Sequence, residues 1–170
     1  NVINCKINSH VLGANMDEKD EAIIKVLSRK AGLSSRTLSK ILNIPISTVH
    51  RRIKKLEKEG TIRGYKALIN FEKTQWPIGA LLLINLAETI PGKGHIPKKN
   101  TLKILKSFNE IEEIIEVQAA NFDVIVKARF ETLKKLSEFV EELRFIEGIE
   151  ESTSAIITED IVLPSPTLVV

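Results

Sequence analysis

Residues 34–65 read SSRTLSKILNIPISTVHRRIKKLEKEGTIRGY, and this stretch decides the fold. Its pattern predicts a short helix over residues 35–42 with Leu38, Ile41 and Leu42 facing inward. A sharp break and a second helix over residues 45–59 follow. Asn43 suits the left-handed conformation that a sharp turn needs. Pro45 disfavours helical geometry in the residue before it and is itself pre-set for a first helical turn. The residues therefore predict two helices joined by a tight turn.

The second of these helices has two chemically different faces. At 100° per residue, the face that we expect to be buried consists of Ile46, Val49, Ile53 and Leu56. The opposite face carries a hydroxyl and four cations, which are Ser47, Arg51, Lys54, Lys55 and Lys58. A helix with an apolar stripe opposite a cationic one, supported by another helix, is suited to entering a DNA groove.

The flanking segments extend this unit on both sides. A helix is expected over residues 17–30, with an acidic first turn that suits its positive N-terminal end. Residues 62–70 are expected to form a hairpin with Gly64 near its turn. Three helices followed by a hairpin make a winged helix-turn-helix, which we assign to residues 16–70.

Charge is distributed unevenly along the chain. Residues 16–70 hold 13 Lys and Arg against 6 Asp and Glu, whereas residues 71–170 hold 11 against 16. The net charge of +3 for the whole chain hides this division. A basic N-terminal part followed by an acidic C-terminal part indicates double-stranded DNA as a partner.

Composition excludes several other classes of protein. The 170 residues, 43% hydrophobic and 28% charged, suit one ordinary globular domain or two small ones. The longest apolar run is too short to span a bilayer, so we expect no membrane partner. No signal segment is evident, which predicts a cytoplasmic protein. Cys5 and the three histidines show no metal-ligand spacing, so no metal or cofactor is expected.

The second half predicts a separate unit over residues 78–163, after a linker over residues 71–77. Strands are expected over residues 78–90, 113–120, 122–130 and 151–161, with helices over residues 101–108 and 133–143 and a loop over residues 91–100. This order is the split βαββαβ arrangement, a ferredoxin-like antiparallel sheet with both helices on one face. The whole chain is therefore expected to be α+β.

The first strand of that sheet indicates self-association. Residues 81–84 read Leu-Leu-Leu-Ile and are apolar on both faces, so the face without helices must be covered. A second copy of the sheet is the simplest cover, which predicts a homodimer. The alternative is that the N-terminal residues or the tail, residues 164–170, fold over this face.

Residues 1–15 show no clear period and have no assigned role. The single methionine, Met16, directly precedes the first predicted helix. Two alternatives stay open: an extension before a native start at Met16, or a true arm or strand that adds to a partner.

Four motifs carry a resemblance to a known family. They are MDEKDEAIIKVL at residues 16–27, TLSKILNIPISTVHRRIKKLEKEGTIRGY at 37–65, AANFDVIVKARF at 119–130 and FIEGIEES at 145–152. In their order and spacing the chain resembles the Lrp/AsnC, or feast/famine, regulators over residues 16–163. The resemblance implies a winged DNA-binding domain joined to a ligand-binding βαββαβ domain of the RAM type. It also implies transcription control by dimers, often assembled into tetramers or octamers, with small molecules bound near the turn between strands two and three.

The chain departs from the family pattern at two places. Pro45 stands where the family often has a polar capping residue, so a side-chain cap is lost. The family's turn of the type Gly-x-Phe/Tyr-Asp here begins with Ala120, and the effector-binding candidates in it are Ala120, Asn121 and Asp123. For Asp123, a purely structural position at the end of a strand is at least an equal alternative. Because a Cβ disfavours positive φ, three alternatives stay open: an amino-acid effector, another effector, or none.

Two groups of residues are predicted to contact DNA. The candidates for base or groove contacts are Ser47, Thr48, Arg51 and Lys54. The candidates for phosphate contacts are Arg36, Lys40, Arg52, Lys55, Lys58, Arg63 and Lys66. Arg52 lies on the flank of its helix, so a structural ion pair is an equal alternative for this residue.

Together these patterns predict a sequence-specific transcription regulator that binds a pseudo-palindrome as a dimer. One alternative is an enzyme resembling the siroheme decarboxylases, which share the two-domain architecture. His95 is the only histidine placed to contribute to such a site, and no constellation surrounds it. A DNA-compacting protein is the other alternative. We expect the protein not to be an enzyme.

Overall fold

The computed structural model describes residues 16–87, 89–90 and 94–161. Within this part the chain divides into two compact units, residues 16–68 and residues 69–161. The expectations for the N-terminal extension and for the tail lie outside the described residues. No helix in the described part is long and apolar enough to cross a membrane.

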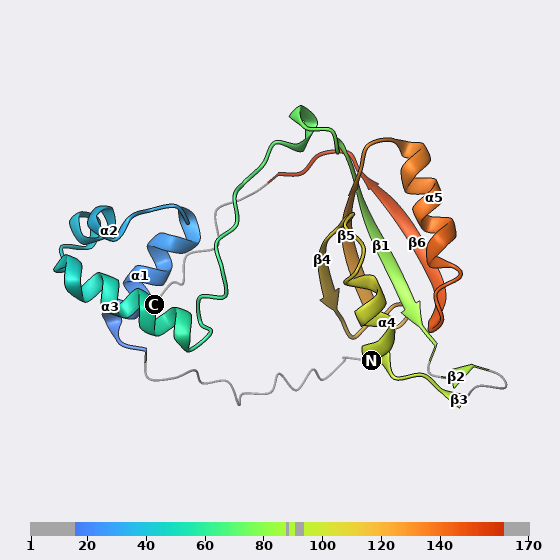
Figure 1. Cartoon of the computed structure of the whole chain (residues 1–170), viewed down its shortest axis with the longest axis horizontal. Helices are drawn as coiled ribbons and strands as arrows, with labels where there is room; N and C mark the ends of the chain where they lie inside the picture. The colour runs from blue at the N-terminus through green and yellow to red at the C-terminus, as the bar shows by residue number, and fades with distance from the viewer. Residues whose placement is uncertain (1–15, 88, 91–93, 162–170) are drawn as a thin grey trace. The chain divides into compact units, whose positions relative to one another are not determined.

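The first unit consists of three helices (Figure 1). They are α1 (Glu18–Arg29), α2 (Ser35–Leu42) and α3 (Ile46–Lys58). The side chain of Asp17 caps α1 by accepting hydrogen bonds from two backbone N–H groups, and Ser34 caps α2 at the N–H of Thr37. The buried apolar core is formed by Ile23, Leu27, Leu38, Ile44, Val49 and Leu56. The three predicted helices are confirmed.

Two apolar residues of this unit do not lie where helical periodicity places them. Ile41 of α2 and Ile46 of α3 are 54% and 47% exposed, although both were expected to face inward. They lie at the two helix ends that adjoin the tight turn, where Leu38 and Ile44 already fill the core. The prediction that both are buried is therefore wrong.

The predicted hairpin over residues 62–70 is also wrong. Residues 61–70 form no strand, and Gly64 does not adopt positive φ. Instead, the first residues of this segment are hydrogen-bonded to the last turns of α3. The N–H of Ile62 donates to the carbonyl of Leu56, and the Tyr65 hydroxyl donates to the Glu57 carboxylate at 3.0 Å.

The second unit is a four-stranded antiparallel sheet with two helices (Figure 1). Its strands are β1 (Ile78–Leu86), β4 (Ile111–Glu116), β5 (Val124–Phe130) and β6 (Ile149–Ile157), in the order β4-β5-β1-β6. Its helices are α4 (Lys98–Leu105) and α5 (Leu133–Leu143), and a short 3-10 turn, η1 (Phe71–Lys73), precedes β1. This strand order is that of the ferredoxin-like split βαββαβ fold, as predicted.

The elements of this unit begin and end a few residues from the predicted positions. β1 ends at Leu86, and a separate small hairpin follows, β2 (Thr89–Ile90) with β3 (Gly94–His95). α4 begins three residues earlier than expected, directly after Pro97. Gly148, with φ of 91°, turns the chain into β6 two residues before the predicted start.

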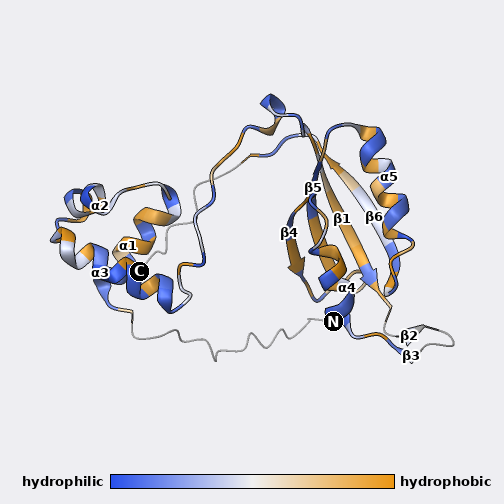
Figure 2. Ribbon diagram, in the orientation of Figure 1, coloured by the Kyte–Doolittle hydropathy of each residue, from blue (hydrophilic) through white to orange (hydrophobic). Residues whose placement is uncertain are grey.

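Alternate residues of β1 separate a covered face of the sheet from an open one. Ala80, Leu82 and Ile84 are buried in one core cluster with residues of both α4 and α5, which confirms that both helices pack on one face. Leu81 and Leu83 belong to the opposite face, and Leu81 is 37% exposed. Figure 2 shows β1 coloured hydrophobic along most of its length. The open face therefore keeps apolar side chains without a covering layer in the described residues.

Candidate nucleic-acid interface and open sheet face

The turn between α2 and α3 is fixed by local hydrogen bonds. Asn43 has φ of 51° and ψ of 44°, the left-handed conformation predicted for it. The N–H of Ile44 donates to the carbonyl of Ser39, and the Ser39 hydroxyl donates back to the carbonyl of Ile44 at 2.6 Å. Pro45 provides no side-chain cap, as expected. The hydrogen bonds between Ser39 and Ile44 constrain the direction in which α3 leaves α2.

The outward face of α3 is hydrophilic and cationic. Val49, Ile53 and Leu56 pack into or against the core, which holds the helix by its opposite side. Thr48 is half-buried. The side chains that are exposed to solvent are those of Ser47, Arg51, Lys54, Lys55 and Lys58. The structure thus brings together on one surface all but one of the candidates for base or groove contacts.

Lys54 has one partner on its own helix. Its Nζ lies 3.0 Å from the Glu57 carboxylate, which also accepts the hydrogen bond from Tyr65. Both donors, Lys54 more than Tyr65, lower the pKa of Glu57. Exposed ion pairs of this kind contribute little stability, so a DNA phosphate can compete with Glu57 for this ammonium group.

Arg52 occupies a different environment from the other cations of α3. Its Nη1 lies 2.6 Å from the carboxylate of Asp17 and 2.8 Å from that of Asp20. The Arg52 side chain is only 16% exposed and that of Asp20 only 1%. Hydrogen bonds from the Asp20 N–H and from Arg52 lower the pKa of Asp17. Arg52 joins α3 to the first turn of α1, and this geometry argues against the predicted phosphate contact.

Lys55 shares the same buried carboxylate but remains accessible. Its Nζ lies 3.4 Å from Asp20, and its side chain is 44% exposed. The other phosphate candidates are exposed and make no ion pair with a described residue; they are Arg36 and Lys40 on α2, Lys58 on α3, and Arg63 and Lys66 beyond it. The cationic surface therefore extends beyond α3 in both directions along the chain.

Asp123 has a structural role in the sheet. Its carboxylate accepts a hydrogen bond from the N–H of Leu86 at 2.9 Å, and its own N–H donates to the carbonyl of Ile84. It therefore completes the pairing of β1 where the β5 strand begins. Ala120 is exposed and does not adopt positive φ, so its turn does not need the glycine that the family usually has.

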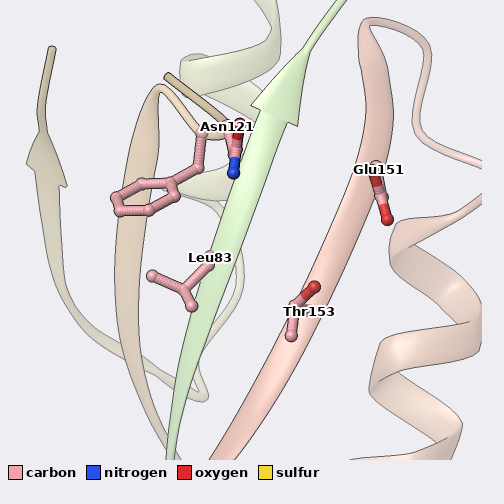
Figure 3. Close-up of a pocket in the computed structure, with 5 residues that line it drawn as sticks. Leu83, Asn121, Glu151 and Thr153 are labelled. Atoms are coloured by element: carbon pink, nitrogen blue, oxygen red, sulfur yellow. The ribbon is translucent and has the colours of Figure 1, made fainter. Parts of the chain in front are cut away.

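A hollow of about 360 Å³ lies on the open face of the sheet, beside the turn that contains Ala120 and Asp123. It is lined by Leu83, Asn121, Phe122, Glu151 and Thr153. Figure 3 shows Leu83 on β1 and Thr153 on the neighbouring β6, with Asn121 near the end of β1. The lining combines an apolar floor with amide, hydroxyl and carboxylate groups. Of the three effector candidates, only Asn121 lines it.

Arg129 lies at another place on the open face and is almost completely buried. Its guanidinium donates to Glu112 and Asp160 and lies 4.2 Å from the centre of the Phe71 ring. Lys127 first, and Arg129 second, lower the pKa of Asp160. A Cβ at position 79 would lie 2.7 Å from a terminal nitrogen of Arg129, so a larger residue there would displace the guanidinium. Arg129 thus holds the segment that enters the unit and the segment that leaves it.

The histidine considered for the enzymatic alternative is His95. His95 is exposed on β3. Among the described residues, no three His, Cys, Asp or Glu side chains are placed to hold a metal ion.

Known proteins are similar to this chain in sequence and in fold. A family profile described as winged helix-turn-helix DNA-binding matches residues 16–63. The HTH-type transcriptional regulator FL11 of Pyrococcus abyssi is 32% identical over 143 residues, covering 84% of this chain and 89% of that protein. An uncharacterised HTH-type transcriptional regulator of Pyrococcus horikoshii is 32% identical over 150 residues, covering 88% and 90%. The chain belongs to the Lrp/AsnC family of transcription regulators.

Solved structures of similar fold agree with this assignment. The Escherichia coli AsnC structure superposes with a TM-score of 0.69 at 18% identity, covering 91% of this chain and 99% of that one. A Neisseria meningitidis transcriptional regulator in complex with L-Met has a TM-score of 0.75 at 21% identity, covering 90% and 96%. This Lrp/AsnC family member is therefore a DNA-binding transcription regulator, and the predicted resemblance and fold class are confirmed.

Sequence patterns missed two features of this Lrp/AsnC protein. The acids of the first turn of α1 were interpreted as complements to the helix dipole, yet Asp17 and Asp20 bind Arg52 more than thirty residues away. The second is the cluster around Arg129, which involves residues far apart in the chain. No local periodicity reports such pairings. For Arg129, the available signal in the sequence was a charged residue between the apolar Ala128 and Phe130.

Proposed function

We propose that the protein binds a specific pseudo-palindromic DNA sequence as a homodimer, through the outward face of α3. The observation that carries this proposal is the exposure of Arg51, Lys54 and Lys58 on a helix whose opposite side is built into the core. A recognition helix enters the major groove in this manner, and two copies read half-sites about 34 Å apart. The curated relatives that it matches are named as transcriptional regulators, and we propose this role in place of an enzymatic one.

The DNA contacts divide by chemistry. We propose that Ser47, Thr48, Arg51 and Lys54 reach base edges or the groove. The proposed phosphate contacts are Arg36, Lys40, Lys55, Lys58, Arg63 and Lys66; Arg52 is left out because of its buried pairing with Asp17 and Asp20. Residues 16–70 form the DNA-binding domain in this proposal, and residues 78–163 form the dimerisation and effector domain.

The dimer is proposed to form through the open face of the sheet. Leu81, Leu83, Ile115 and Ile125 lie on this face, as the cross-strand pairing of β1, β4 and β5 requires. An apolar face that faces water is unfavourable, and a second copy of the sheet would remove it from solvent. Assembly of such dimers into tetramers or octamers is proposed from the family resemblance.

We propose an amino acid as the effector, bound at the hollow lined by Asn121 and Glu151. The carboxylate of Glu151 suits an ammonium group, and the amide of Asn121 can donate to a carboxylate. A thermal-shift screen of the amino acids against the wild type and Asn121→Ala tests this. A ligand that stabilises both proteins equally would place its site elsewhere.

The DNA-binding proposal is tested by a salt titration with duplexes selected from a random pool. Binding through phosphates releases counterions, so log affinity should fall linearly with log salt, by about 0.9 for each phosphate neutralised. With several cations on each protomer, a steep slope is expected. An affinity that is independent of salt would overturn the proposal.

A further inference from the structure

Ile46 is the first residue of α3, and its side chain is 47% exposed. Single exposed apolar residues are common on protein surfaces and need no explanation by themselves. The position of this one is what distinguishes it. Residues in the N-terminal turn of a recognition helix are the ones that reach base edges when the helix enters the major groove.

The neighbours of Ile46 place it at the edge of the proposed DNA-binding surface. Side chains four residues apart are adjacent on a helix, so Ile46 precedes His50 in one row and Ser47 precedes Arg51 in the next. All four are exposed. Ile46 therefore adds the apolar member to a surface that otherwise offers hydroxyl, imidazole and guanidinium groups.

An aliphatic side chain cannot bind a phosphate, but it has one natural partner in the major groove. The C5 methyl of thymine is the apolar group that B-DNA presents there, and apolar side chains recognise it by contact. We infer that Ile46 is a specificity-determining residue that packs against the C5 methyl of a thymine in each half-site. This inference rests on the proposed DNA-binding function, and it adds a base preference that no charged residue of α3 supplies.

The test uses the full-length protein and a duplex selected from a random pool. Each thymine is replaced in turn by uracil, which keeps the base pair and removes only the methyl group. One thymine position in each half-site should respond. The affinity of the wild type should fall about fourfold when that thymine is replaced in one half-site, and about fifteenfold when it is replaced in both. Ile46→Ala should bind the thymine and uracil duplexes with equal affinity at that position.

Ile41→Ala is the matched control. Ile41 is the same residue type, is 54% exposed, and lies in α2 just before the turn. It should keep the full dependence on the methyl group. Ile46→Val, which retains a branched side chain, should keep part of it.

Three outcomes distinguish the inference from the function on which it rests. Tight, salt-dependent binding that is equal for thymine and uracil at every position would overturn the inference alone. Methyl dependence that survives in Ile46→Ala would also overturn it, because another residue would then make the contact. Failure of the wild type to bind any duplex would overturn the proposed function, and this inference with it.

Discussion

The outward face of α3 and the open face of the sheet are both exposed in the protomer, yet they differ in chemistry. The α3 face presents cations such as Arg51 and Lys58, and the aliphatic Ile46 is exposed at the first residue of the helix. The sheet face presents apolar side chains, with Leu81 and Leu83 at its centre. Polyanionic DNA suits the first, and another apolar surface suits the second. The contrast shows that exposure alone does not identify a partner, whereas the charge of the exposed groups does.

The largest effect is expected from reversing one charge on the α3 face. Arg51→Glu removes a contact worth about 1–3 kcal/mol from each protomer and adds repulsion by phosphate, so DNA binding should be lost. Mobility-shift or fluorescence-anisotropy titrations measure this. The control is Lys25→Glu, the same charge change at an exposed position on α1, which should bind nearly as well as the wild type. Unaltered binding by Arg51→Glu would remove α3 from the interface.

The next effect concerns the sheet face. Leu83→Glu would bury an unpaired carboxylate in the proposed dimer, which costs about 3–5 kcal/mol, so sedimentation should show monomers. Leu83 faces Ile125 and Thr153 across the neighbouring strands, and neither offers a compensating charge. Leu133→Glu, at a 55% exposed position on α5, should leave the dimer intact. A dimer that survives Leu83→Glu would mean that another surface joins the protomers.

A smaller effect separates support of α3 from contact with DNA. Arg52→Met leaves Asp20 buried with only Lys55 nearby, so the free energy of unfolding of the helical unit should fall by about 3 kcal/mol. Arg51→Met should change it by less than about 0.5 kcal/mol. Urea denaturation followed by circular dichroism measures both. Equal stability of the two variants would show that the pairing of Arg52 with Asp20 does not hold the helices together.

The smallest effect is a dependence on pH. The lowered pKa of Asp17 means that its carboxylate stabilises the folded unit at pH values above the unfolded pKa of about 3.9. That stabilisation is lost as the pH falls through the lower folded pKa. Asp17→Asn keeps a helix cap but not the charge, so its deficit in unfolding free energy should shrink upon acidification. A deficit that is constant with pH would contradict this assignment.

Sequence patterns predicted the helices and strands because these depend on periodicities of 3.6 and 2 residues. The sheet arrangement followed from the order of these elements along the chain. The turn at Asn43 and Pro45 was predicted because local sterics decide it. The exposure of Ile46 was not predicted, since periodicity assigns a residue to a face but not to a depth at a helix end. The hairpin predicted around Gly64 does not form, because glycine permits a reversal of the chain without requiring one.

The site residues also divide into those that local patterns placed and those whose role depends on a partner distant in the chain. The exposed cations of α3 followed from the helical pattern, as did their separation from the core. For Arg52 the sequence left a phosphate contact and an ion pair equally open, because its partner Asp20 is distant in the chain. The role of Asp123 was likewise left open, because its partner is the backbone of Leu86. Only tertiary structure brings such groups together.

The most direct test of the account is the dependence of affinity on the spacing between half-sites. A symmetric dimer presents two α3 helices to one side of the duplex, at half-sites about one helical turn apart. Inserting about 5 base pairs rotates one half-site to the opposite side of the DNA, so affinity should fall toward that of a single half-site. The same affinity for both spacings, at equal protein concentration and salt, would contradict recognition by paired α3 helices.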